Sequence, residues 1–258
     1  MSRTALLIVS FGTTYPQTRQ ETIEATEKAF KKSFPDADFF RAFTSKIVIS
    51  RIKKNEGIAI DTPKEALAKI IAAGYDTLLV QSLHLIPGIE YNQLLDQVDK
   101  VASQFKQVTV GKPLLTSFED YQRVVAFLKD VVQPQSADEA VLFMGHGTAH
   151  SSFTAYACLD HMLMGSQHYM GAVESYPDIQ FEIGRLKQDG VKKVILHPFM
   201  LVAGNHAQSD MESERPVSWQ SKLEQAVFSV SAKLQGMGAY PTIQNMFIEH
   251  LKNAERKW

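Results

Sequence analysis

Short apolar runs alternate with helical patterns along the whole chain. The short runs are rich in β-branched and aromatic residues, which is typical of buried strands, and the amphipathic stretches between them are typical of helices. This alternation predicts an α/β protein with doubly wound, mainly parallel sheets and crossover helices. The expected strands are Ala5–Ser10, Asp38–Thr44, Thr77–Leu83, Gln107–Gly111, Ala140–Met144, His168–Glu174 and Lys193–Leu201. The expected helices include Thr18–Ser33, Thr62–Ala73, Tyr91–Phe105 and Tyr121–Val131.

The motifs of the first half recur in the same order in the second half. Four pairs of segments match: Gly74–Val80 with Gly190–Leu196, Leu85–Glu90 with Leu201–His206, Ser10–Thr13 with Gly145–Thr148, and Arg41–Ser45 with Gly171–Ser175. Internal similarity of this kind indicates two α/β units related by an approximate duplication.

A short polar stretch, Gln133–Ser136, interrupts the pattern near the middle of the chain. It predicts an N-terminal half over residues 1–134 and a C-terminal half over residues 135–258. The sequence leaves open whether the final helix, near Met246–Glu255, packs on its own half or crosses to the other. Ligands of such units bind beyond the carboxyl ends of the strands, so we expect the matched loops to face one active-site cleft between the halves.

Composition narrows the classes of function. The chain has a formal net charge of -1, 45% hydrophobic residues and no basic block of the nucleic-acid-binding kind. It has no apolar run near the roughly 18 residues of a membrane span and no leader cleavage site, so we expect a cytoplasmic protein without nucleic-acid or membrane partners. The single cysteine, Cys158, excludes an internal disulfide and a multi-cysteine metal site, so a bound metal must use nitrogen and oxygen ligands.

Several nucleotide and hydrolase signatures are missing from the sequence. It contains no Walker A loop, no G-x-G-x-x-G fingerprint, no G-x-S-x-G elbow and no H-E-x-x-H helix. We therefore expect chemistry that needs no nucleotide.

Three loop positions differ between the matched halves in a chemically consistent way. In the alignment of the repeats, Phe11 becomes His146, Thr44 becomes Glu174 and Glu90 becomes His206. Two imidazoles and a carboxylate suit a divalent first-row metal ion, and three protein ligands leave coordination positions open. His146, Glu174 and His206 are therefore the candidate metal ligands.

Each of these residues also has an ordinary structural interpretation. A histidine in a glycine-rich loop is often only a surface or hydrogen-bonded residue, and Glu174 is in a place to cap the following helix. His84 and His197 sit close to strand ends, where a supporting or proton-shuttling role is open.

The motifs together resemble one enzyme family. The segments that carry the resemblance are Val9–Thr13, Arg41–Ser45, Gln81–His84, Phe143–Gly147, Ala155–His161, Gly171–Pro177 and Met200–Ala207. The chain resembles the anaerobic sirohydrochlorin cobaltochelatases of cobalamin biosynthesis, class II chelatases of the lyase class that are related to protoporphyrin ferrochelatase.

The resemblance implies two flavodoxin-like halves and ATP-independent insertion of Co2+ into sirohydrochlorin or its reduced precursor. It implies cobalt ligation by His146, Glu174 and His206. We expect His146 to accept a pyrrole proton and Glu174 to take part in proton removal. The family commonly has an aspartate where this chain has Asn205, which puts a supporting carboxylate there in doubt.

Residues for binding the tetrapyrrole follow from the same loops. The candidates are Ser10, Phe11, Thr13, Ser45, Leu85, Ile86 and Thr148, with basic Arg51 as a further partner for the ring carboxylates. The alternative is that the hydroxyls only cap helices.

Other functions compatible with the sequence are insertion of Fe2+ or Ni2+ into a similar ring, and non-catalytic carriage of a tetrapyrrole or metal. A small-ligand sensor is a third alternative, which the missing secretion signal disfavours. The sequence leaves the oligomeric state open, a homo-oligomer included.

Overall fold

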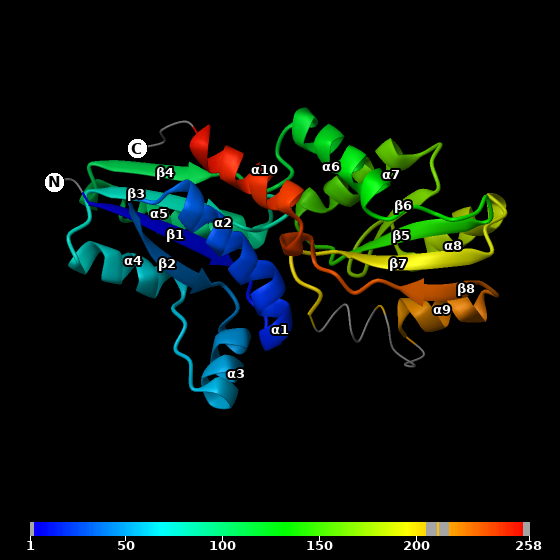
Figure 1. Ribbon diagram of the computed structural model, residues 1–258, viewed down its shortest axis with the longest axis horizontal. Coiled ribbons are helices and arrows are strands. Elements are labelled where there is room, and N and C mark those ends of the chain that lie inside the picture. The colour runs from blue at the N-terminus through cyan, green and yellow to red at the C-terminus, as the bar shows by residue number, and fades with distance from the viewer. Residues whose placement is uncertain (1–2, 205–210, 212–216, 255–258) are drawn as a thin grey trace. The chain divides into compact units, whose positions relative to one another are not determined.

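The computed structural model describes residues 3–204, 211 and 217–254 of the 258-residue chain (Figure 1). The chain forms two compact units, residues 1–116 with 238–258, and residues 117–237. The first boundary therefore comes before helix α6 (Phe118–Val131), not at residue 134, and the chain returns to the first unit for its terminal helix α10 (Pro241–Lys252).

The first unit is built on a four-stranded parallel sheet, here called sheet A. Its strands are β1 (Thr4–Ser10), β2 (Ala37–Phe43), β3 (Thr77–Ser82) and β4 (Gln107–Gly111), in the order β2-β1-β3-β4. The second unit repeats this arrangement in sheet B, with β5 (Glu139–Gly145), β6 (His168–Ala172), β7 (Lys193–Phe199) and β8 (Ser229–Ala232) in the order β6-β5-β7-β8. Both sheets follow the flavodoxin-like order 2-1-3-4, which confirms the predicted fold class.

Helices cover both faces of sheet A. One face packs α4 (Pro63–Ala72) and α5 (Ile89–Asp99) into a core with Leu7, Leu78 and Val110. The other face is covered by α2 (Ala25–Ser33) and α10, which contact each other (Figure 1). The remaining elements of this unit are α1 (Pro16–Arg19), η1 (Gln20–Glu24), α3 (Lys46–Glu56), η2 (Ala102–Gln104) and most of η5 (Met237–Ala239), which begins at the last residue of the second unit.

Sheet B has the same layering. Helices α8 (Ile179–Gln188) and α9 (Trp219–Gln225) share a core with Leu142, Met144 and Leu196. Helix α7 (Thr154–Leu163), preceded by η3 (Ser151–Phe153), packs against β6 and α6. The strand β8 was not among the predicted strands, because its four residues alternate between exposed and half-buried and give no apolar run.

Strand register corrects one of the internal matches. Ser10 pairs with Phe43 in sheet A, and Gly145 pairs with Ala172 in sheet B. The next backbone contacts agree, since the N–H of Ser45 donates to Phe11 O and the N–H of Glu174 donates to His146 O. The counterpart of Glu174 is therefore Ser45, and the predicted match with Thr44 is wrong by one residue.

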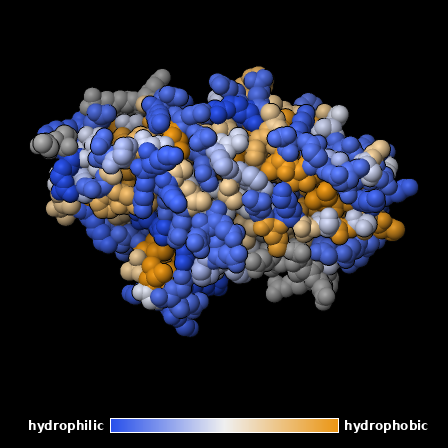
Figure 2. All heavy atoms as spheres, viewed as in Figure 1, coloured by the Kyte–Doolittle hydropathy of each residue, from blue (hydrophilic) through white to orange (hydrophobic). Residues whose placement is uncertain are grey.

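The face in Figure 2 is mostly hydrophilic, with separate hydrophobic areas over each unit. Within the described ranges, no helix combines the length and apolar character that crossing a bilayer requires.

Candidate metal-binding edge

The candidate ligands of the second unit stand at the carboxyl edge of sheet B. His146 directly follows β5, and Glu174 follows β6, the strand beside it. The His146 Nδ1 and Glu174 Oε2 atoms lie 3.7 Å apart, and their side chains are 41% and 56% exposed. Both groups are therefore accessible to a ligand that approaches this edge.

Gly147 brings the two loops together. Its φ of 88° is in the left-handed region, and a Cβ atom there would lie 2.8 Å from Glu174 N and from Ser175 N. Only glycine allows this approach without moving the backbone. The close contact lets Glu174 N donate to His146 O at 2.9 Å, which fixes the two candidate ligands side by side.

The surroundings of His146 favour one tautomer. Its Nδ1 lies 3.1 Å from Gly147 O, and a donated Nδ1–H in this contact leaves the basic lone pair on Nε2. In the observed rotamers Glu174 faces the Nδ1 side of the ring, so joint ligation of one metal ion requires rotation of an exposed side chain. Imidazole and carboxylate together can bind a divalent ion or accept protons.

The capping alternative for Glu174 is wrong. The N-cap of α8 is Asp178, whose Oδ1 accepts from Phe181 N at 2.8 Å. Glu174 therefore does not serve the following helix.

The third candidate ligand, His206, lies outside the described residues. Within the described ranges, no three His, Cys, Asp or Glu side chains form a cluster suited to a metal ion. The structure thus brings together two of the three proposed ligands and leaves the third as a prediction.

The corresponding edge of sheet A carries three of the four candidate substrate-binding hydroxyls, and the fourth, Thr148, follows β5 in the second unit. Three of the four accept local hydrogen bonds: Thr13 Oγ1 from Tyr15 N, Thr148 Oγ1 from His150 N in the second unit, and Ser45 Oγ from Val48 N as the N-cap of α3. Each still carries its own hydroxyl proton as a donor. Ser10 differs, because its Oγ is buried without a hydrogen-bond partner.

The apolar candidates divide by exposure. Phe11 is 48% exposed in the loop after β1, whereas Leu85 and Ile86 are each only 9% exposed. Phe11 therefore offers a ring much more surface than Leu85 or Ile86 does. Arg51 lies on an exposed position of α3.

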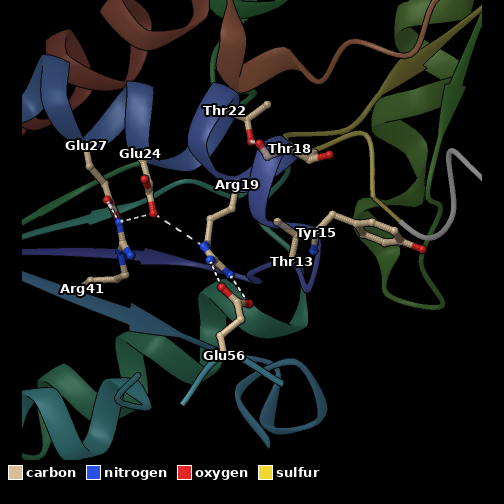
Figure 3. A network of polar contacts seen from close by, with 9 residues as sticks. All are labelled: Thr13, Tyr15, Thr18, Arg19, Thr22, Glu24, Glu27, Arg41 and Glu56. Carbon is tan, nitrogen blue, oxygen red and sulfur yellow. Dashed lines mark hydrogen bonds and ion pairs between the residues drawn. The ribbon is translucent and has the colours of Figure 1, made fainter. Parts of the chain in front are cut away.

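A buried ion-pair network anchors the helix that follows the Phe11 loop (Figure 3). Arg19 donates to Glu56 on α3 at 3.1 and 2.5 Å, and Arg41 on β2 pairs with Glu27 on α2. Glu24 lies between the two arginines, 3.5 Å from Arg19 and 3.3 Å from Arg41. Burial raises the pKa of the Glu27 carboxyl, although its bond to Arg41 opposes this. This network could not be predicted from the sequence, because the paired residues Arg19 and Glu56, and Arg41 and Glu27, are distant from one another in the chain.

Two further polar side chains at the edge of sheet A were not among the candidate site residues. Thr44 Oγ1 and His84 Nε2 are both buried and have no hydrogen-bond partner. In contrast, His197 on β7 is fully buried, and its Nδ1 lies 3.1 Å from Pro198 O. Burial lowers the pKa of His197 to about 4, so it remains neutral near pH 7.

Comparison with known proteins identifies close relatives. The family model described as cobalt chelatase (CbiK) matches residues 4–256. A sirohydrochlorin cobaltochelatase of Salmonella typhimurium is 44% identical over 253 residues, covering 97% of this chain and 96% of that one. The sirohydrochlorin cobaltochelatase CbiKC of Nitratidesulfovibrio vulgaris is 32% identical over 263 residues, covering 98% and 91%.

Solved structures share the fold at lower identity. SirB from Bacillus subtilis with Fe3+ aligns with a TM-score of 0.64 at 15% identity, covering 97% of this chain and 94% of that one. CbiX, the terminal enzyme of siroheme biosynthesis in denitrifying bacteria, aligns with a TM-score of 0.59 at 18% identity, covering 96% and 98%. These two likenesses concern the fold alone.

Proposed function

The chain belongs to the cobalt chelatase (CbiK) family, and from this premise we propose that it inserts Co2+ into sirohydrochlorin, or its reduced precursor, without ATP. The observation that supports the site is the placement of His146 beside Glu174 at the carboxyl edge of sheet B. Co2+ is the second substrate of this reaction, and its proposed ligands are His146, Glu174 and His206.

Metal insertion replaces two pyrrole protons by one divalent ion. Co2+ passes from protein ligands to four ring nitrogens, and two N–H protons must leave the ring. His146 and Glu174 together supply two bases, so each can take one proton as its bond to the metal is lost. The proposed roles of ligand and base thus follow one another on the same side chains.

The ring is proposed to bind through its carboxylates and one face. Phe11 supplies exposed aromatic surface, and the hydroxyls of Ser10, Thr13, Ser45 and Thr148 can donate to carboxylate oxygens. Leu85 and Ile86 are both buried, so their proposed role is to support the loop after β3 more than to contact the ring. A surface that bends the ring would favour metallation, because bending exposes the nitrogen lone pairs.

Turnover tests the proposal against a carrier function. Sirohydrochlorin in large excess over protein is mixed anaerobically with Co2+, and its absorbance spectrum is followed beside a protein-free control. We expect many rings to be metallated per protein chain. Metallation at the control rate, together with stable binding of about one ring per chain, would contradict the chelatase function and indicate a carrier.

The metal is tested separately, because imidazole and carboxylate ligands also suit Fe2+ and Ni2+. Initial rates with each ion at equal free concentration should be highest for Co2+. A higher rate with Fe2+ or Ni2+ would keep the chelatase chemistry and change the assigned metal. We propose that the reaction takes place in the cytoplasm.

A further inference from the structure

His84 presents a buried nitrogen that the protein leaves unused. The residue follows β3, and its segment is fixed because Leu114 N donates to His84 O at 3.1 Å. On one side of the ring, Nδ1 lies 2.7 Å from Ser82 Oγ. On the other side, Nε2 has neither solvent nor a hydrogen-bond partner.

The contacts of Ser82 indicate which nitrogen carries the proton. The backbone N–H of His84 approaches Ser82 Oγ at 3.4 Å and uses an acceptor position of that oxygen. The hydroxyl proton of Ser82 is then directed to His84 Nδ1, so Nε2 carries the hydrogen. A buried N–H without an acceptor is unfavourable, which makes it a candidate for a ligand oxygen.

Thr44, on the other side of Phe11, also has a buried polar atom without a hydrogen-bond partner, its Oγ1. The N–H of Thr44 donates to Ser10 O, and the N–H of Leu83 donates to Val9 O, so the register of sheet A continues past its strands. Phe11, Thr44 and His84 then form one row across β2, β1 and β3. Thr44 and His84 are separated by two strand spacings, or about 10 Å between Cα atoms.

The second unit has no such groups in the equivalent row. Continuing the register of sheet B places His146, Val173 and Met200 opposite Phe11, Thr44 and His84. The two equivalent edges therefore carry opposite arrangements of polar and apolar side chains. At sheet B, the candidate metal ligand His146 is flanked by the apolar residues Val173 and Met200. Sheet A has an aromatic ring flanked by two unsatisfied polar groups.

We propose that His84 Nε2–H and Thr44 Oγ1–H bind two separate carboxylates of the tetrapyrrole, on either side of Phe11, and select rings with many carboxylates. This inference rests on the proposed function for its substrate class. A porphyrin-sized ring with carboxylates around its rim can present two of them about 10 Å apart, whereas one carboxylate cannot span that distance.

The electrostatic state of His84 suits this role. Burial lowers its pKa to about 4, with the nearby Glu90 charge acting in the opposite direction. Neutral His84 therefore keeps a single fixed N–H near pH 7, and its geometry is set before the ring arrives. The donor strengthens when its acceptor is ionised, as a carboxylate is.

The second unit supplies the test substitutions. His84→Met and Thr44→Val introduce the residues of the equivalent row in sheet B, so each fits a buried strand end of this fold. Each should weaken equilibrium binding of sirohydrochlorin, measured without metal by absorbance titration, by about ten- to a hundredfold. Thr44→Val removes only an unsatisfied buried polar atom, so it should at the same time keep or raise the unfolding temperature of the free protein.

Three comparisons separate the role from a structural effect. His84→Gln, which keeps an N–H donor, should retain most of the affinity. Gln97→Met on α5, which removes another buried oxygen without a partner, should leave ring binding unchanged. The loss in His84→Met should be large for an octacarboxylate porphyrin and small for a dicarboxylate porphyrin.

The outcomes distinguish this proposal from the proposed function. Equal affinity of wild type, His84→Met and Thr44→Val for sirohydrochlorin would overturn the proposal, even if the wild type inserts Co2+ normally. Equal losses for octacarboxylate and dicarboxylate rings would overturn the selection of carboxylates. A wild type that binds the ring with the predicted selectivity and does not metallate it would instead contradict the chelatase activity alone.

Discussion

Gly147 is the residue on which the geometry of the proposed metal-binding edge depends. Gly147→Ala adds a Cβ at 2.8 Å from two backbone nitrogens, at a φ of 88°. Gly165→Ala is the matched control, because it has a φ of 78° in the same unit and open space around the added atom. Left-handed backbone alone costs about 1–2 kcal/mol, so both variants should lose that much stability.

Only Gly147→Ala should also separate Glu174 from His146. We expect its rate of Co2+ insertion to fall at least tenfold, while Gly165→Ala keeps the wild-type rate at a temperature where both are folded. Urea denaturation measures the stability, and absorbance measures the rate. Equal rates in the two variants would show that the close contact of the loops does not matter for the reaction.

At the residue scale, the sequence predicted His146 and Glu174 as ligands, and the structure places them side by side, but one correspondence between the halves was misplaced. Identical Ala and Ser residues in Arg41–Ser45 and Gly171–Ser175 aligned the two segments in a register that the strands do not use. Hydrogen bonding between neighbouring strands decides such a register, and a single segment does not contain that information. The lack of hydrogen-bond partners at Thr44 Oγ1 and His84 Nε2 likewise depends on contacts with other segments, so it could not be recognised before the fold was known.

Among the elements, the helix after the Phe11 loop is held by Arg19. Arg19 is 5% exposed and its guanidinium pairs with Glu56, whose side chain is 20% exposed, so Arg19→Met leaves a mostly buried carboxylate without its partner. We expect a loss of about 3 kcal/mol in the stability of the first unit. Adding Glu56→Gln should recover part of that loss.

The exposed pair of Lys69 and Asp61 provides the comparison. Lys69→Met removes a similar ion pair whose lysine is 64% exposed, and should cost less than about 1 kcal/mol. Urea denaturation of the single and double variants measures these differences. A loss in Arg19→Met no larger than in Lys69→Met would contradict an anchoring role for the buried network.

Helix α8 contains a carboxyl group that makes stability depend on pH. Glu182 is fully buried, and burial, aided by the Asp160 charge and opposed by Arg185, raises its pKa from 4.5 to about 8. The folded state thus holds a proton that the unfolded state releases above pH 4.5. The stabilisation of the folded state by this bound proton is complete below pH 4.5 and is lost as the pH rises to about 8.

Glu182→Gln stays neutral and should remove this dependence. Between pH 4.5 and 8, the unfolding free energy of the wild type should fall relative to that of the variant by on the order of 4 kcal/mol. Glu119→Gln, at an exposed position of α6, is the control. Parallel pH profiles for wild type and Glu182→Gln would contradict the raised pKa.

At the scale of the whole molecule, the chain ends in the unit where it began. Helix α10 contacts α2, β3 and β4, and Phe247 on α10 is fully buried. Phe247→Ala should destabilise the first unit by about 3–5 kcal/mol, whereas Asn245→Ala at an exposed position should have little effect. Hydrogen exchange should show faster exchange in residues 3–116 and unchanged exchange in 117–204.

Faster exchange confined to the second unit would contradict the assignment of α10. The return of this helix could not be predicted from its sequence, because its amphipathic pattern shows that one face is buried but not against which sheet. The alternation of strands and helices, in contrast, is local, and it predicted seven of the eight strands of the two sheets.

The rate of Co2+ insertion into excess sirohydrochlorin by wild type and by His146→Phe tests the role of the proposed metal-binding edge most directly. Phenylalanine is the residue at the equivalent position of the first unit, Phe11, so the substitution removes the imidazole and keeps a ring that this loop accommodates. Loss of the proposed metal ligand and general base predicts a fall of at least about a hundredfold, with ring binding retained. A His146→Phe variant that metallates sirohydrochlorin at the wild-type rate would contradict the central role of this edge.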